Sequence, residues 1–277
     1  MSMRVNTNIS SVNAMRNLYT NDRNINSNFE KMASGSRINK AADDAAGLAI
    51  SENLKGQIRS ANQASRNAND GISLVQTAEG GLNEMGNIIV RMRELAIQAA
   101  SDTVGENERT FINAEVQQLK SEMQRISDST KWGKTKLLDG STPVFDFQVG
   151  LYNSEESDRI SFDSSGNVAT IDALGLEGLD FSSKEGASGS LDSLDSAQVE
   201  VNRIRSNLGA LQNRLVSTVS NLGIQQESLS AANSRIRDAD MAEVTADLTK
   251  NQILMQANTA TLSQANQKNT LALKLLG

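Results

Sequence analysis

Apolar residues recur every seven positions over most of this chain, and this repeat limits the folds open to it. One uninterrupted row runs from Leu54 to Ala96, and a second runs from Leu194 to Ile236. A seven-residue repeat keeps one face of a helix apolar and suits helices that pack side by side at shallow angles. The rows predict two long helices, at 45–100 and 191–236, in an antiparallel bundle.

A third, shorter helix is expected at 107–129, where apolar residues again share one face. Met85, Met92 and Met123 form a stripe that is typical of a bundle core. We expect the following residues to line the core: Leu54, Val75, Leu82, Ile89, Leu119, Ile126, Val201, Leu208, Leu215, Leu222, Leu229 and Ile236. The fold class expected is therefore mainly α.

The middle of the chain changes period. Between 144 and 151 apolar and polar residues alternate, which predicts a strand, and Ile160 with Phe162 indicates a second one. A small β patch is expected over 138–182. The segment Ser182–Ser190 is rich in Gly and Ser and is expected to be a loop before the return helix.

Both ends of the chain continue the apolar repeat, although chain ends are usually polar. A front helix at 4–34 and a back arm at 241–277 each need a partner for the apolar face. The opposite arm and other copies of the chain are the expected partners. The residues expected to pack between arms or in assembly are Val5, Ile9, Val12, Leu18, Ile25, Phe29, Met32, Met241, Val244, Leu248, Met255 and Leu262.

Two pairs of polar residues in and near the arms have specific expected roles. Asp43 and Asp44 end a linker at 34–45 and precede an Ala-rich helix, so we expect them to cap it. A carboxylate metal site is disfavoured because no histidine supports it. Asn251 and Asn258 either set the register of a buried seam or line a wet channel, and the sequence leaves both open.

Composition excludes several classes of function. The chain has no cysteine and no histidine, which removes thiol chemistry, the commonest general base and the commonest metal ligand. The net charge is −6 with no basic stripe, so nucleic acid is not an expected partner. We find no Sec-type signal and no membrane-spanning run. We expect no cofactor, no membrane partner and no enzymatic activity.

Several stretches together resemble bacterial flagellin. They are MASGSRINKAADDAAGLAI at 32–50, NANDGISLVQTAEGGLNE at 67–84, VRMRELAIQAA at 90–100, INAEVQQLKSEM at 112–123, LGALQNRL at 208–215 and SRIRDADMAEVTADLTKNQILMQANTATLSQANQ at 234–267. The resemblance implies an inner-tube domain from 1–44 plus 238–277 and a helical bundle domain at 45–237. It implies no separate outer domain here.

The resemblance also implies a function. It points to a structural subunit that polymerises helically into the flagellar filament for swimming and is exported unfolded through the flagellar type III apparatus to the cell exterior. The implied partners are other copies, an export chaperone on the C-terminal arm, and the filament cap and hook-junction proteins. A hook–filament junction protein and a cytosolic coiled-coil scaffold remain alternatives.

One surface role follows from the resemblance alone. In flagellins recognised by Toll-like receptor 5, an arginine, a leucine and a glutamate form the hot spot, and the matching residues here are Arg91, Leu95 and Glu115. The resemblance implies that the same surface also packs between subunits in the filament. Spacing alone favours a different interpretation, in which Arg91, Arg93 and Glu94 form the solvated face of a long helix.

Overall fold

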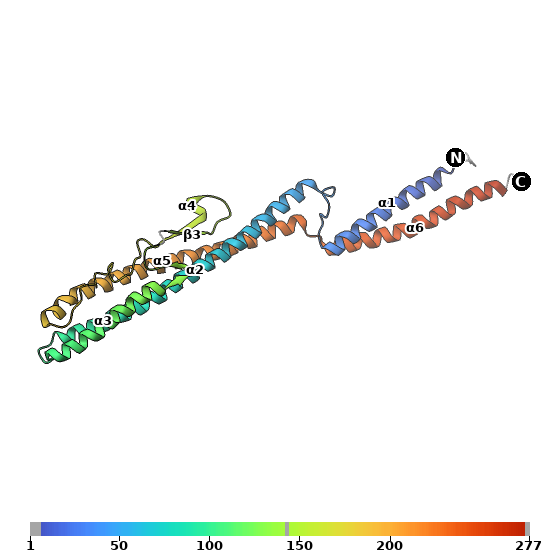
Figure 1. The fold of residues 1–277 in the computed structure, drawn as a ribbon. Coiled ribbons are helices and arrows are strands. Elements are labelled where there is room, and N and C mark those ends of the chain that lie inside the picture. The colour runs from blue at the N-terminus through green and yellow to red at the C-terminus, as the bar shows by residue number, and fades with distance from the viewer. Residues whose placement is uncertain (1–6, 142–143, 275–277) are drawn as a thin grey trace. The chain divides into compact units, whose positions relative to one another are not determined.

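The computed structural model describes residues 7–141 and 144–274, which are mostly helical (Figure 1). The long helices are α1 (Ile9–Ser34), α2 (Ala45–Ala99), α3 (Glu106–Ser129), α5 (Lys184–Arg237) and α6 (Met241–Lys274). Between α3 and α5 lie the short elements β1 (Lys131–Trp132), β2 (Thr135–Lys136), β3 (Val144–Gln148), α4 (Glu155–Asp158) and β4 (Arg159–Asp163). The mainly α fold is confirmed, with paired terminal helices and small antiparallel hairpins.

The chain divides into two compact units. The first combines Met1–Ile58 with Ser228–Gly277, and the second is Arg59–Glu227. The helices α2 and α5 each contribute to both units. The division therefore does not fall at the linker, because the first turns of α2 and the last turns of α5 belong with the arms.

The core of the second unit is built by the seven-residue rows. Side chains from α2, α3 and α5 form one buried cluster, and Met85, Met92 and Met123 are fully buried in it. Of the expected core residues, those buried are Val75, Leu82, Ile89, Val201, Leu208, Leu215 and Leu222. Leu119 and Ile126 are half-buried and pack against the cluster.

Three expected core residues were wrongly placed. Leu54, Leu229 and Ile236 are only half-buried and lie in the first unit. The cause is helix length, since α3 spans about 36 Å and α2 about 83 Å at 1.5 Å per residue. Where no third helix packs, the continuing row is covered on one side only. Ala61, Ala64 and Leu222 mark this change, because they form a small cluster separate from the main core.

The β patch is a pair of two-stranded hairpins. The expected strands pair antiparallel as β3 and β4, with Phe145 opposite Phe162 and Phe147 opposite Ile160. This hairpin packs on α2 at Gly71, where an added Cβ would lie 3.2 Å from the Phe147 ring. The alternation of residues did not reveal the β1–β2 hairpin or α4, because each is too short to show a period.

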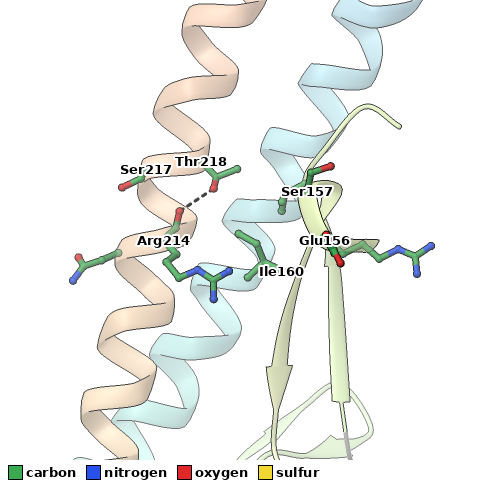
Figure 2. A pocket seen from close by; sticks show the side chains of 9 residues that line it. Glu156, Ser157, Ile160, Arg214, Ser217 and Thr218 are labelled. Carbon is green, nitrogen blue, oxygen red and sulfur yellow. Dashed lines mark hydrogen bonds between the residues drawn. The ribbon is translucent and has the colours of Figure 1, made fainter. Parts of the chain in front are cut away.

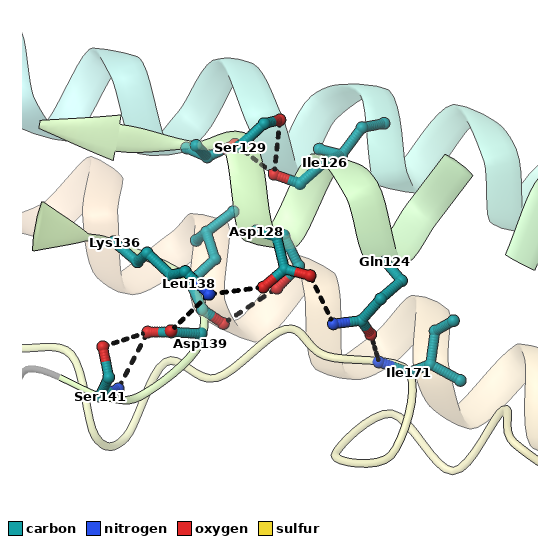
Figure 3. A network of polar contacts seen from close by, with 11 residues as sticks. Gln124, Ile126, Asp128, Ser129, Lys136, Leu138, Asp139, Ser141 and Ile171 are labelled. Atoms are coloured by element: carbon teal, nitrogen blue, oxygen red, sulfur yellow. Dashed lines mark hydrogen bonds and ion pairs between the residues drawn. The ribbon is translucent and has the colours of Figure 1, made fainter. Parts of the chain in front are cut away.

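A polar network fixes the segment after α3 (Figure 3). Lys136 Nζ lies 2.7 Å from Asp128 Oδ1 and 3.4 Å from Asp139 Oδ2. The Lys136 hydrogen bond lowers the pKa of Asp128 below its usual value. Gln124 Nε2 donates to the other Asp128 oxygen, and Gln124 Oε1 accepts from the amide of Ile171. The network thereby connects α3 to two later loops.

The segment expected as a Gly/Ser loop is mostly helical, since α5 begins at Lys184 rather than near 191. Ser183 Oγ accepts from the amide of Gly186, as an N-cap does, and the Ser183 carbonyl accepts from Ala187. Ala187 is fully buried in the core. Capping and burial outweigh the weak helix propensity of the glycines here.

Asp44 and Asp43 take different roles before α2. Asp44 Oδ1 accepts from the amide of Gly47 at 2.8 Å, which is an N-cap hydrogen bond. Asp43 does not cap the helix, because its carboxylate accepts from the amides of Asn39 and Lys40 and closes the preceding turn. Those backbone hydrogen bonds lower the pKa of Asp43.

Candidate assembly surfaces

The two arm helices, α1 and α6, pack side by side in antiparallel directions (Figure 1). We call this pair of helices the arm hairpin. At one end Asn8 Nδ2 donates to the carbonyl of Ala265, and at the other Ser36 forms a backbone bridge with Asp238. Asn8 also caps α1 through the amide of Ser11. The hairpin therefore joins segments more than 200 residues apart in the sequence.

The residues expected to pack between the arms fall into two groups. Ile25, Val244 and Leu248 are buried in the hairpin. Half-buried beside them are Leu18, Met32, Met255 and Leu262. These seven residues mark the face through which α1 and α6 meet.

The remaining arm residues are exposed and do not pack between α1 and α6. They are Ile9, Val12, Phe29 and Met241. Val5 lies outside the described residues. A single partner helix covers only one side of α1, so its other apolar row remains open. Within that row Val12 is 55% exposed and Tyr19 is 67% exposed.

We call the open side of α1 the outward arm face and define it by Ile9, Val12, Met15 and Tyr19. All four side chains are more than half exposed. They are spaced by three or four residues, so they share one side of the first three turns. Clustered exposed apolar side chains are typical of a surface that another molecule covers.

The arm hairpin also contains a polar pocket of about 290 Å³. Its lining residues come from both helices and are Asn24, Ser27, Asn28, Lys31, Asp247, Lys250 and Asn251. Asn251 and Asn258 are both half-buried. Asn251 thus borders a polar space, and whether it sets register or faces a wet channel stays a prediction.

The linker between α1 and α2 is an ordered joint. Gly35 ends α1 in the left-handed conformation with φ of 67°. The amide of Arg37 donates to the carbonyl of Arg237 at 2.6 Å, and Ala239 donates to Gly35 at 3.0 Å. Ile38 is fully buried and packs close to Gly47. The segment that connects α1 to α2 therefore pairs with the segment that connects α5 to α6.

Side chains reinforce this pairing. The Arg37 guanidinium donates to the carbonyl of Ile236 at 2.8 Å and so satisfies a carbonyl in the last turn of α5. Arg237 forms an ion pair with Glu52 in α2. The sequence indicated a linker here but not its contacts, because they depend on residues about 200 positions apart.

The residues matched to the receptor hot spot lie together only in part. Arg91 Nη2 lies 2.9 Å from Glu115 Oε1, which connects α2 to α3, and Arg91 also pairs with Glu94. The Glu115 hydrogen bond raises the pKa of Arg91. Leu95 is only 2% exposed and belongs to the bundle core. A direct contact between Leu95 and a partner therefore does not fit the subunit.

A groove lies between the β3–β4 hairpin and α5 in the second unit (Figure 2). It has a volume of about 430 Å³, and Arg214, Ser217 and Thr218 line its α5 side. Glu156, Ser157 and Ile160 face them from α4 and β4. Sequence patterns did not reveal this groove, because it depends on where the hairpin packs.

Two kinds of site are absent from residues 7–141 and 144–274. No group of three or more Asp, Glu, Cys or His side chains there could hold a metal ion. None of the helices in these ranges combines the length and the apolar character that crossing a bilayer requires.

Comparison with known proteins identifies close relatives. The model of the bacterial flagellin N-terminal helical region matches residues 5–142, and that of the C-terminal helical region matches 191–276. A flagellin of Halalkalibacterium halodurans is 45% identical over 99% of this chain and its own full length. A flagellar filament core protein of Treponema maltophilum is 40% identical over the same shares.

Solved structures show similar folds. The crystal structure of Bacillus cereus flagellin covers 57% of this chain and 88% of its own, with a TM-score of 0.50 and 26% identity. A putative flagellar hook-associated protein from Vibrio parahaemolyticus covers 71% of this chain and 100% of its own, with a TM-score of 0.60. The identity to the second structure is 13%, so that similarity concerns the fold alone.

Proposed function

Because the chain belongs to the bacterial flagellin family, we propose that its arm hairpin forms the inner layer of a helical polymer and buries its outward arm face against neighbouring copies. The chain is a structural subunit of the flagellar filament, and it polymerises with itself. The arms take part in this assembly through the outward arm face.

The observation that carries this proposal is the outward arm face. The arms already pair within one subunit through Ile25, Val244 and Leu248, yet Val12 and Tyr19 stay exposed on the opposite side of α1. A surface that meets a different surface of the next copy extends without closing and gives a helical filament. One arm pair thus has a face for its own chain and another for its neighbours.

The layers of the subunit are assigned as the family resemblance implies. Residues 1–44 and 238–277 form the inner tube, residues 45–237 form the surrounding bundle, and no separate outer domain is added. The linker at 34–45 joins the two layers. The linker pairs with residues 237–239, which connect α5 to α6. This pairing supports the assignment, because the two connecting segments then form one joint.

The test is elongation of filament seeds by the purified chain. We expect added subunit to lengthen seeds continuously, as a filament subunit must. A hook–filament junction protein would bind once and stop, and a cytosolic scaffold would not bind. Seed length measured by electron microscopy against added protein distinguishes these outcomes, and failure to elongate contradicts the proposal.

Export and location are further parts of the proposal. The subunit passes unfolded through the flagellar type III apparatus, with a chaperone on the C-terminal arm, and is added beneath the cap beyond the hook-junction proteins, outside the cell. The absence of cysteine and the single proline fit a chain that must be threaded and refolded. Retention of the chain inside cells with a working export apparatus would contradict this route.

Recognition by Toll-like receptor 5 is a second role, supported by the exposed pair Arg91 and Glu115. Leu95 lies beneath this surface and supports it rather than touching a partner. We expect Arg91→Ala to weaken binding to the receptor ectodomain about tenfold, as loss of a hot-spot arginine commonly does. Surface plasmon resonance measures this, with Arg125→Ala on α3 as control. Equal binding by both variants would refute the assignment.

A further inference from the structure

The methionines that the structure describes differ in exposure, with Met32 and Met255 half-buried between the two extremes. The chain has no cysteine, so its nine methionines carry all of its sulfur. In the bundle, Met85, Met92 and Met123 are fully buried. In the arms, Met15 is 59% exposed and Met241 is 45% exposed. An oxidant in solution therefore reaches the arm sulfurs first.

Met15 differs from Met241 in its surroundings. Met15 lies in the middle of the outward arm face, between Val12 and Tyr19 along α1. Met241 is the first residue of α6, next to Asp240, whose carboxylate accepts from the amide of Ala242. A polar atom added to Met15 would fall within an apolar surface, whereas one added to Met241 would fall beside an already polar helix start.

We propose that Met15 is a site of oxidative modification that stops the free subunit from assembling. The oxidant is hydrogen peroxide. The Met15 thioether sulfur attacks one peroxide oxygen, and an S–O bond forms as the O–O bond breaks. The leaving hydroxide takes the proton of the transferred oxygen and becomes water. Sulfur loses two electrons and peroxide gains them, so the products are one sulfoxide and one water.

The effect on assembly rests on the proposed function of the outward arm face. A sulfoxide converts a flexible apolar side chain into a polar one. When a neighbouring copy covers the face, the new oxygen loses its water, and the side chains of Ile9 and Val12 offer no donor to replace it. We expect the critical concentration for elongation to rise about tenfold, which corresponds to about 1.4 kcal/mol.

The first measurement locates the oxidation. Purified full-length subunit is treated with hydrogen peroxide, digested with trypsin and analysed by mass spectrometry. Met15, Met85 and Met241 fall in separate tryptic peptides, because Arg or Lys residues separate them. We expect Met15 and Met241 to gain one oxygen well before Met85. Oxidation of Met85 as fast as Met15 would overturn the proposed site.

The second measurement tests the consequence. Seed elongation is compared before and after peroxide for the native chain, Met15→Leu and Met241→Leu, with helicity checked by circular dichroism. We expect peroxide to lower the elongation rate about tenfold in the native chain and in Met241→Leu. In Met15→Leu the rate after peroxide should stay near the rate before it. Methionine sulfoxide reductase with dithiothreitol should restore the native rate.

The outcomes separate the modification from the function. Elongation at the untreated rate by subunit fully oxidised at Met15 would overturn the proposal, and so would equal loss in Met15→Leu. If untreated subunit fails to elongate seeds, the proposed function fails and the assembly effect falls with it. The mass spectrum still decides whether Met15 is the reactive sulfur.

Discussion

Deletion of residues 241–277 is expected to abolish filament growth while leaving the second unit folded. The deletion removes all of α6, and with it Val244 and Leu248, the buried contacts that α6 makes with α1. Without α6, α1 loses the helix that covers one of its apolar sides, and its outward arm face is exposed already. A helix in a protein gains most of its stability from packing, and α1 is rich in Asn, a weak helix former, so it is expected to be marginal without a partner.

The second unit should survive because its core lies within Arg59–Glu227. Leu82, Met92, Val116, Leu208 and Phe181 are buried there in one core cluster, and the deletion removes none of its members. We expect circular dichroism to show less helix but a cooperative thermal transition close to that of the full chain.

Seed elongation and analytical ultracentrifugation complete this test. We expect the truncated chain to stay monomeric at concentrations where the full chain elongates seeds. Adding a synthetic 241–277 peptide in trans serves as a control for loss of the arm rather than damage to the bundle. Filaments formed by the truncated chain alone would show that the arm hairpin is not the assembly element.

The sequence predicted the long helices well because packing and periodicity agree there. The row from Leu194 to Leu222 is buried as expected, and α2 begins and ends within a residue of the expected bounds. A seven-residue repeat depends on local spacing alone, so one sequence suffices to find it. The repeat does not report how many helices pack around it, which explains the error at Leu54, Leu229 and Ile236.

The parts that could not be predicted depend on distant residues. The joint needs Arg37 beside Ile236 and Gly35 beside Ala239, and no local pattern encodes such contacts. Similarly, the helical start of α5 depends on Ala187 reaching the core, which offsets Gly186 and Gly189. Leu95 shows the same limit, since a residue matched by motif to a surface role lies in the interior.

For the outward arm face, the sequence predicted apolar rows on α1 but not which row the other arm would leave open. Val12 and Ile25 each belong to a seven-residue apolar row, yet Val12 is exposed and Ile25 is buried. That difference makes a substitution at Val12 the sharper test of assembly, because it should leave the hairpin intact.

Val12→Asp should reduce seed elongation at least about 100-fold, which corresponds to about 2.7 kcal/mol. In the free subunit Asp at position 12 stays in water near the start of α1, where a negative charge is favoured by the helix dipole. In the polymer the same carboxylate would be desolvated among Ile9, Met15 and Tyr19, and a pair with Arg16, four residues on, would have to be desolvated with it. The penalty therefore falls on assembly rather than on folding.

Asn13→Asp is the matched control, because it adds the same charge one residue away on an exposed position of α1. Asn13 already accepts from Arg16 Nη2 at 2.9 Å, so an aspartate there gains a cation as partner. We expect Asn13→Asp to elongate seeds within about threefold of the native chain, since exposed charge pairs contribute only about 0–1 kcal/mol. Equal loss in both variants would mean that charge near the N-terminus matters and that Val12 is not buried by a neighbour.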